Sequence, residues 1–414
     1  MQAVEVGENF GASKKFGNNE RLSYLWCSCL FLVCFSPILE AVLWRRLDVI
    51  DELVTVLFLL LLLFKLLKTG VAGKEFVFFL VLIVSVVFFS LMLGRNRSAV
   101  EVVSQAFLMS KLFVFFLFAN EFVHQKVALA FFKIVLAITF IGVVMNILNP
   151  QVFLHLGLNE KIREEFTSIN RVGGFQLNAN RVAHLFALLS FASAEMLGMR
   201  KKLYFVLLIF AAVGLVFTGG RLGMALFVIG LSLKVLSAYK SNIRIVIWFL
   251  VSPVFAYIAF YGASIIFFGE EGLKNDIGYF RLFLLTEGGR LALDYFPFGS
   301  GLGTYGTKFA YDVGVYQETR VADTFFYRAD TALYDCNVAS LIGEMGFFFA
   351  AMFLILLFRL VSKTKWKFDR TIWLGVLVFV SFSLFFESFL SNSICAASLV
   401  LFLFGLESAS KKEE

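Results

Sequence analysis

The chain has 414 residues, of which 60% are hydrophobic, 17% aromatic and only 16% charged, and its mean hydropathy is +0.84. A soluble domain carries about a quarter charged residues, so the composition excludes an ordinary soluble protein and predicts an integral membrane protein. The formal net charge of +7 is assigned to membrane topology rather than to nucleic-acid binding, because surplus Lys and Arg mark the cytoplasmic loops of multispan proteins.

Several cofactor classes lack their usual sequence patterns. Four cysteines (Cys27, Cys29, Cys34 and Cys395) lie in apolar runs and leave only Cys336 in a long polar loop, which argues against a disulfide scaffold. The three histidines lack an HExxH pattern, which argues against a protein-ligated zinc site. There is no P-loop and no GxGxxG segment after a strand, so the sequence contains no recognisable motif for binding ATP or a dinucleotide. The sequence therefore predicts a protein without cofactor or metal.

Apolar runs close to the length of a membrane-spanning helix recur along the chain. They predict an all-α polytopic membrane protein with about twelve transmembrane helices. The least secure division lies in the long apolar stretch 371–407, which only Glu387, Ser391, Asn392 and Ser393 interrupt. The expected spans are 22–44, 53–68, 75–93, 100–120, 127–148, 181–199, 202–219, 222–239, 243–267, 338–360, 371–388 and 391–407.

The lysines set the expected orientation. They gather at one set of helix ends, whereas the opposite short loops contain none, and the lysine-rich side is predicted to be cytoplasmic. Residues 1–21 and 408–414 would then be cytoplasmic tails. Transmembrane helices 1–9 would occupy residues 22–267, and helices 10–12 would occupy residues 338–407.

Two long polar segments fall on the outer side in this arrangement. One is the outer loop 149–180, and the other is a large periplasmic loop, 268–337, between helices 9 and 10. The second contains ten acids and six bases, a net charge of −4. Because a structureless loop of this length is uncommon and this one is rich in aromatic residues, we expect short helices lying on the membrane face.

Arginines flanked by small residues gather on the predicted outer side. Arg221 lies in a TGGRLG segment, Arg171 and Arg181 bracket a stretch rich in Gly and Asn that includes Asn180, and Arg290 follows two glycines. The planar fork of an exposed arginine suits phosphate oxygens. These residues predict a site for a lipid diphosphate; arginines that only snorkel to the interface are the alternative.

A glycine-rich turn follows Arg290. Its Gly301 and Gly303 could bring backbone N–H groups close to the same diphosphate, with Tyr305 beside them in a supporting role. On its own such a pattern is more often a tight turn, and its nearness to Arg290 in the chain is what points to one site.

Acidic residues are the candidates for acid–base chemistry. Asp335 directly precedes the tenth predicted span and could accept a proton from a sugar hydroxyl; a salt bridge that positions an arginine is the alternative. For Glu344 we favour a structural, supporting role. Glu195 and Glu387 are functional candidates because acids in or beside spans are costly. His184 is expected to be packed or hydrogen-bonded rather than a base.

The order of these segments resembles the bacterial O-antigen polymerase and O-antigen ligase superfamily. The resemblance covers roughly residues 165–350, and each matching segment is short and degenerate. The matching segments are Arg171-x-x-Gly174 with Asn178-x-Asn180, Thr218-Gly-Gly-Arg221-x-Gly223, Arg290 with Pro297-Phe-Gly-Ser-Gly-Leu-Gly303, and 335–346.

The resemblance implies a metal-independent glycosyltransferase in the bacterial inner membrane, with its active site facing the periplasm. The donor would be a glycan on undecaprenyl diphosphate. Arg171, Arg221 and Arg290 stand where the family's diphosphate-binding arginines are expected, and Arg221, Arg290 and Asp335 would be catalytic. Arginines can stabilise the charge that develops on a departing diphosphate.

The resemblance leaves the acceptor open. Ligases of the family typically have a His-Asn pair where this chain has Asp335-Cys336, so an O-antigen or exopolysaccharide polymerase, acting on a lipid-linked oligosaccharide repeat unit, is the first interpretation. A ligase acting on lipid A core is the alternative. A multispan transporter or flippase for lipid-linked glycans is the alternative from another class. Whether a chain-length regulator binds stays open.

Overall fold

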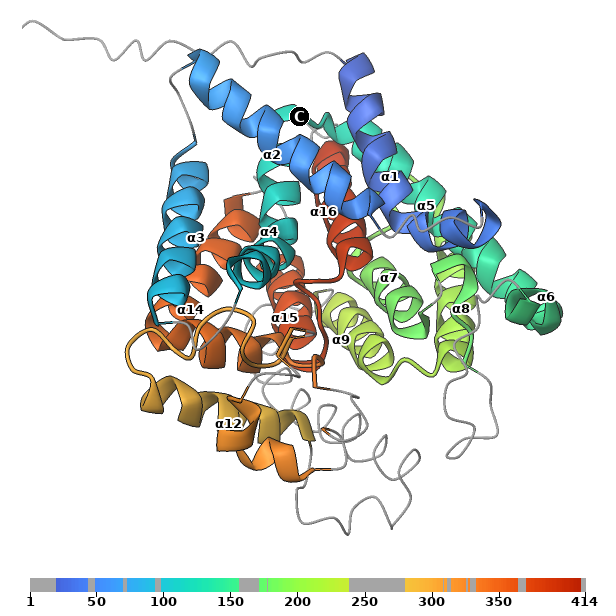
Figure 1. Cartoon of the computed structure of the whole chain (residues 1–414). Helices are drawn as coiled ribbons and strands as arrows, with labels where there is room; N and C mark the ends of the chain where they lie inside the picture. Colours follow the sequence, from blue (N-terminus) through green and yellow to red (C-terminus); the bar gives the residue numbers. More distant parts are fainter. Residues whose placement is uncertain are drawn as a thin grey trace, which may run out of the picture.

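The computed structural model describes residues 20–43, 49–69, 73–93, 98–155, 171–176, 178–237, 280–307, 309–310, 314–324, 327, 333–363 and 370–410. Within these ranges all regular secondary structure is helical, which confirms the predicted all-α class (Figure 1). Helices suit this composition, because a helix satisfies its own backbone hydrogen bonds where water is excluded.

The helices of the first half follow the first five predicted spans closely. They are α1 (Glu20–Leu43), α2 (Ile50–Thr69), α3 (Lys74–Leu93), α4 (Ala99–Phe122) and α5 (Gln125–Leu148), followed by the short α6 (Pro150–His155) and the 3-10 turn η1 (Gly174–Gln176).

The second half contains helices of more varied length. They are α7 (Ala179–Phe191), α8 (Lys201–Thr218), α9 (Arg221–Ser237), α12 (Phe280–Asp294), the 3-10 turns η3 (Tyr316–Glu318) and η4 (Arg320–Asp323), α14 (Asn337–Lys363), α15 (Arg370–Phe386) and α16 (Ser393–Ser410). The ninth predicted span, 243–267, lies outside the described residues.

Among the described residues, six helices are long and apolar enough to cross a membrane. They are Glu20–Leu43, Lys74–Met92, Ala99–Phe122, Gln125–Leu148, Lys201–Thr218 and Asn337–Ser362. The protein is therefore a helical membrane protein by this measure. Helix α2 has 20 residues but begins with Asp51 and Glu52 and has Lys68 in its last turn, which shortens its uncharged stretch. Twelve spans and a periplasmic loop stay predictions.

Two helices in the second half differ from the predicted spans, one in where it ends and the other in its shape. The helix expected over 181–199 stops at Phe191, because Ser193 starts a turn in which its Oγ accepts from the Met196 N–H (3.2 Å). Helix α14 is kinked at Gly346, whose φ of 69° is left-handed. By contrast, the division within 371–407 is found where it is expected, between Phe386 and Ser393.

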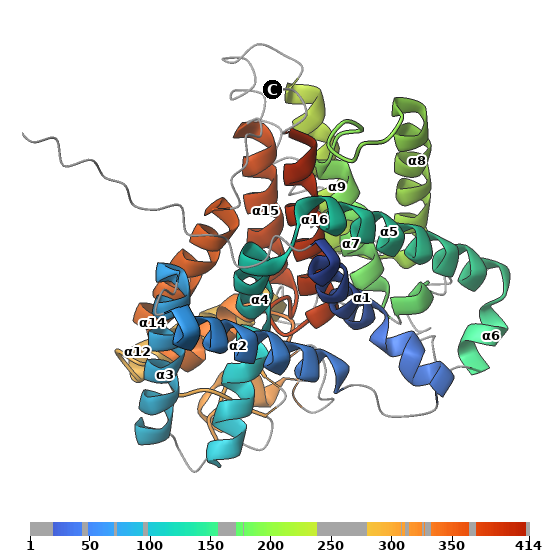
Figure 2. The same cartoon turned by 90° about the horizontal axis from the view of Figure 1, so that it is seen from above.

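Helix α16 occupies the centre of the bundle, between α4, α5 and α7 (Figures 1 and 2). Its residues from Ser393 to Leu406 are buried, and α4 is the most buried of the candidate spans. Helix α12 packs against α14 at one end of the bundle, at the bottom of Figure 1.

Polar contacts join helix ends into two groups. At one end Lys65 pairs with Glu121, and Arg359 Nε lies 3.3 Å from Glu75 Oε1. At the other end lie the starts of α7, α9 and α14 and the break between α15 and α16. The first group belongs to the lysine-rich side; which group faces the cytoplasm stays a prediction.

Candidate functional site

Arg171 connects the end of helix α8 to the start of helix α7. Its Nε donates to the backbone oxygen of Thr218 (2.9 Å), and its Nη2 donates to Asn180 Oδ1 (2.5 Å). Gly219, with a φ of 58°, ends α8, so the chain turns at once into α9, which begins at Arg221. The predicted Arg171–Asn180 stretch and the TGGRLG segment are therefore side by side.

The segment before α7 is held against α5. The Gly174 N–H donates to Asn146 Oδ1 (3.2 Å), and Gly174 has a φ of 52°. A Cβ added at Gly142 would lie 2.7 Å from the Phe175 ring, so the two backbones approach closely. This packing fixes the position from which Arg171 reaches the helix ends.

Arg181 and His184 project from the first turns of α7. Arg181 Nη1 lies 3.5 Å from the Gln176 backbone oxygen, and its Nε is buried with no hydrogen bond to any described residue. His184 Nδ1 lies 2.8 Å from the Asn180 backbone oxygen and 3.2 Å from Glu387 Oε2. Glu387 directly follows α15, so the helix break brings an acid to the start of α7.

Arg281 and Asp335 join this group from the long polar segment 268–337. Arg281 Nη2 donates to Asp335 Oδ2 at 3.0 Å, and the two side chains are 27% and 41% exposed. Glu387 interacts electrostatically with Asp335 and with two arginines, Arg171 and Arg281. In addition, Asn337 Oδ1 accepts from the Leu390 N–H (2.7 Å), which ties the start of α14 to the helix break.

We call this group the arginine–carboxylate cluster. Its members are Arg171, Arg181, Arg281, Asp335, Glu387 and His184. With His184 neutral, three positive charges meet two negative charges, so the cluster has a positive surplus. Arg221 adds a further positive charge beside it. The cluster can bind an anion.

Arg290 lies in different surroundings. Its Nη1 is 3.7 Å from Glu287 Oε2 and its Nε is 3.6 Å from Asp294 Oδ2. Its Nη2 donates to the backbone oxygen of Glu318. Arg290 comes nine residues after Arg281 on α12, about 14 Å along a helix axis. The structure thus places Arg290 among acids and does not bring it to Asp335.

The glycine-rich turn is bound to α14. The Gly301 N–H donates to the Glu344 backbone oxygen (2.9 Å), and the Tyr305 N–H donates to the Glu344 carboxylate (3.2 Å). The Gly303 N–H also faces that carboxylate, which accepts from Gln105 Nε2 as well (3.3 Å). These N–H groups therefore already donate hydrogen bonds to acceptors within the protein. The fully buried Glu344 fixes the turn.

Tyr305 connects the turn to α12. Its hydroxyl donates to the Leu284 backbone oxygen at 2.7 Å. Burial raises the pKa of Tyr305 well above its ordinary value, so the hydroxyl stays a neutral donor. Glu344 and Tyr305 together hold α12, and with it Arg281, against the start of α14.

One group of side chains has the composition of a metal site. Potential ligand atoms of His184, Glu387 and Cys395 lie within 4.8 Å of one another. The short contact of His184 Nδ1 with the Asn180 backbone oxygen (2.8 Å) requires an N–H there, so Nδ1 has no lone pair for a metal. The other ring nitrogen, Nε2, is buried with no hydrogen bond to any described residue and keeps its lone pair. Nearby arginines also oppose a cation. The absence of a metal stays a prediction.

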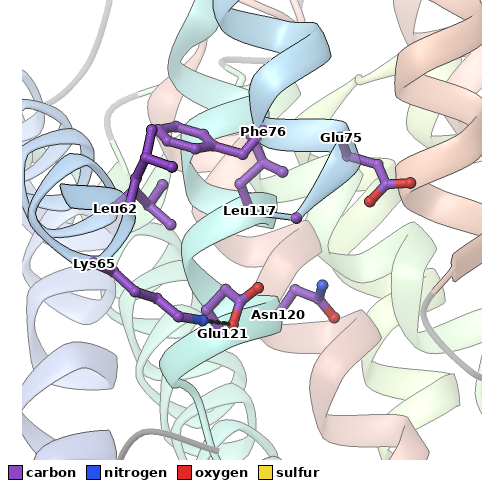
Figure 3. Close-up of a pocket in the computed structure, with 9 residues that line it drawn as sticks. Leu62, Lys65, Glu75, Phe76, Leu117, Asn120 and Glu121 are labelled. Carbon is purple, nitrogen blue, oxygen red and sulfur yellow. Dashed lines mark hydrogen bonds and ion pairs between the residues drawn. The ribbon is translucent and has the colours of Figure 1, made fainter. Parts of the chain in front are cut away.

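A small pocket lies at the opposite end of the bundle. Its volume is about 20 Å³, room for about one water. Lys65 and Glu121 point toward each other across it, whereas Glu75 points away (Figure 3). An ion pair and a space this small leave no room for a lipid-linked ligand.

Of the six members of the cluster, the sequence indicated Arg171, Arg181, Asp335 and Glu387 as functional candidates and His184 as a packed or hydrogen-bonded residue, but it missed Arg281. Arg281 has no flanking glycine or asparagine, and its partner Asp335 is 54 residues away. Glu387 was expected to matter as an acid near a span, but nothing in its sequence neighbourhood indicates His184 as its partner.

The fold and the cluster define a class: a helical membrane protein with a group of arginines and carboxylates at one end of its bundle. Comparison with protein-family models, curated proteins and solved structures gives no match.

Proposed function

We propose that the protein is a membrane glycosyltransferase of the O-antigen or exopolysaccharide polymerase type. It transfers a glycan from undecaprenyl diphosphate to a lipid-linked repeat unit at the periplasmic face of the bacterial inner membrane. The observation that carries the proposal is the meeting of three arginines from separate segments around two carboxylates. It is supported by the resemblance in the order of the sequence segments.

The cluster suits a diphosphate for electrostatic reasons. Arginine forks bind phosphate oxygens through paired hydrogen bonds, and the positive surplus favours a ligand with several negative charges. Helices α7 and α9 begin here, and helix N-termini favour anions. The non-helical backbone between α15 and α16 suits a position beside a polar site, where its backbone groups find partners.

The reaction needs no nucleotide. The acceptor hydroxyl loses its proton to a carboxylate of the cluster, and its oxygen forms a bond to the anomeric carbon of the donor glycan. The bond from that carbon to the diphosphate oxygen breaks, and the electron pair leaves with undecaprenyl diphosphate. Arginines beside the leaving group stabilise the new charge.

A second candidate function has one observation in its favour. Lys111 is buried in the middle of α4, where its Nζ lies 2.6 Å from Asp51 Oδ2, and Ser393 donates to the same oxygen. Ion pairs inside the membrane are typical of transport pathways, so a lipid-linked glycan transporter or flippase is the alternative.

Deletion of the gene, followed by gel analysis of surface polysaccharide, tests the proposal. A polymerase predicts single repeat units on lipid A core, restored to long chains by the wild-type gene. Core without O-chain, together with accumulated lipid-linked polymer, would instead indicate a ligase. An unchanged profile would contradict both activities.

Transfer by the purified protein separates an enzyme from a transporter. In nanodiscs with a lipid-linked oligosaccharide, an enzyme lengthens the glycan and releases undecaprenyl diphosphate in equal amounts. Lipid-linked substrate that crosses a vesicle membrane without a new glycosidic bond would support the transporter and overturn the proposal.

A further inference from the structure

Glu387 lies at a position where an acid is costly. It is 8% exposed and follows the last residue of α15, where the helix dipole disfavours a negative charge. An acid kept at such a place in a membrane protein needs a reason. The position is also the point at which the bundle's polar segments meet.

The contact with His184 holds one oxygen of the Glu387 carboxylate. His184 Nδ1 lies 3.2 Å from Oε2, while the ring is fixed by the 2.8 Å contact with the Asn180 backbone oxygen. His184 is 2% exposed, whereas the Glu387 side chain is 11% exposed. Of the two side chains, Glu387 is the more accessible.

Charged and titratable groups from several segments interact electrostatically with Glu387. Arg171 faces it from the segment before α7, Arg281 from α12, and Asp335 from the start of α14. Cys395 of α16 interacts electrostatically with both Glu387 and Arg181. The carboxylate is therefore placed among the arginines assigned to the diphosphate.

Asp335 differs from Glu387 in the side chain that contacts it directly. Its Oδ2 accepts a hydrogen bond from the Arg281 guanidinium at 3.0 Å, so its negative charge is opposed by a direct ion pair. That contact suits the positioning of Arg281. Glu387 has a histidine as its direct partner and no guanidinium hydrogen bond among the described residues.

We propose that Glu387 is the catalytic base of the transfer and that His184 is its positioning residue. This inference rests on the proposed function. In the step, the acceptor hydroxyl gives its proton to Glu387, while its oxygen bonds to the anomeric carbon. The carbon–oxygen bond to the diphosphate breaks, and the electron pair leaves with the diphosphate between the arginines. Asp335 keeps Arg281 in place.

Glu387→Gln in nanodiscs tests this assignment through two readouts, transfer rate and binding of undecaprenyl diphosphate. We expect transfer to fall by about 10²–10⁴-fold, the usual contribution of a general base. Diphosphate binding should be unchanged or tighter, because a negative charge is removed beside the arginines. Asp335→Asn is the matched control. Its transfer rate should fall by less than about tenfold, well below the loss expected for removal of a general base.

His184→Asn is a second variant that removes the positioning contact and leaves Glu387 intact. It should lower kcat by about tenfold, which is less than the loss expected when the base itself is removed, and it should leave diphosphate binding unchanged. If His184 served only packing, the variant would lower the protein yield instead. Transfer within threefold of wild type by a folded Glu387→Gln protein overturns the inference, as does full transfer by His184→Asn if Glu387→Gln does not fold. Wild-type protein that neither transfers nor binds the diphosphate would instead reject the proposed function.

Discussion

Arg281 and Arg290 lie on the same helix but in opposite electrostatic surroundings. Arg281 belongs to a cluster in which arginines outnumber carboxylates, and its direct partner is Asp335. Arg290 is within 4 Å of two carboxylates, Glu287 and Asp294. The same residue type therefore lies in a cluster with surplus positive charge at one position and between two carboxylates at the other.

The difference also shows what a sequence motif can miss. Arg290 follows two glycines and precedes the glycine-rich turn, which makes it conspicuous in the sequence. Yet the turn's N–H groups are used by Glu344, and acids surround Arg290. The assignment of Arg290, Gly301 and Gly303 to the diphosphate is still a prediction, and variants of α12 can test it.

The largest expected effect comes from truncating each arginine. Arg281→Ala should lower the rate of glycosyl transfer by about 10²-fold or more, the scale of losing one donor to a developing anion. Arg290→Ala should change the rate per folded molecule by less than about threefold. Transfer by both variants is measured at matched protein concentration. A larger loss of transfer in Arg290→Ala than in Arg281→Ala would support the assignment of Arg290 to the diphosphate and would show that Arg281 is not part of the site.

A smaller effect is expected at Glu287, on stability rather than on transfer. Glu287 is 1% exposed, and its Oε1 accepts from Arg320 Nε at 2.9 Å. Glu287→Ala leaves the arginines beside it without their carboxylate and should cost about 1–3 kcal/mol. Thermal unfolding in detergent measures this loss. A large fall in transfer by folded Glu287→Ala protein would show that this region is more than structural.

The smallest expected effect is at Gly289, directly before Arg290. A Cβ added there has no atom within 4 Å, and alanine favours a helix by up to about 1 kcal/mol over glycine. Gly289→Ala should thus raise thermal stability slightly and leave transfer unchanged. Gly288→Ala is the contrasting variant, since its Cβ would lie 2.7 Å from the Ala339 backbone oxygen. Lost transfer by a stable Gly289→Ala protein would indicate a ligand close to Arg290.

Much of the fold follows from the sequence because apolar length determines a helix in a membrane protein. Most described helices begin and end close to the predicted bounds, and the polar residues around Glu387 mark the break before α16. The early end of α7 was not predictable from hydropathy, because the residues after Phe191 are still largely apolar. The turn there depends on local bonds to Ser193.

The site was less predictable than the helices. Arg171, Arg181 and Asp335 were found because of their neighbours in the chain, and the structure brings them to one end of the bundle. The pairing of Arg281 with Asp335 and of His184 with Glu387 depends on how α12 and α15 pack. Close helix contact at Gly288 fixes α12, and no spacing in the sequence reports that register.

Binding of undecaprenyl diphosphate is the most direct test of the central claim, that the positive surplus around Arg281 holds a lipid diphosphate. The wild-type protein, Arg281→Gln and Arg290→Gln are compared in nanodiscs, with undecaprenol as the uncharged control lipid. The account predicts that the wild type binds the diphosphate more tightly than the alcohol. Arg281→Gln should bind the diphosphate about tenfold more weakly or worse, which corresponds to about 1.4 kcal/mol. Arg290→Gln should bind it as tightly as the wild type does. Equal binding by wild type and Arg281→Gln, or a loss confined to Arg290→Gln, would contradict it.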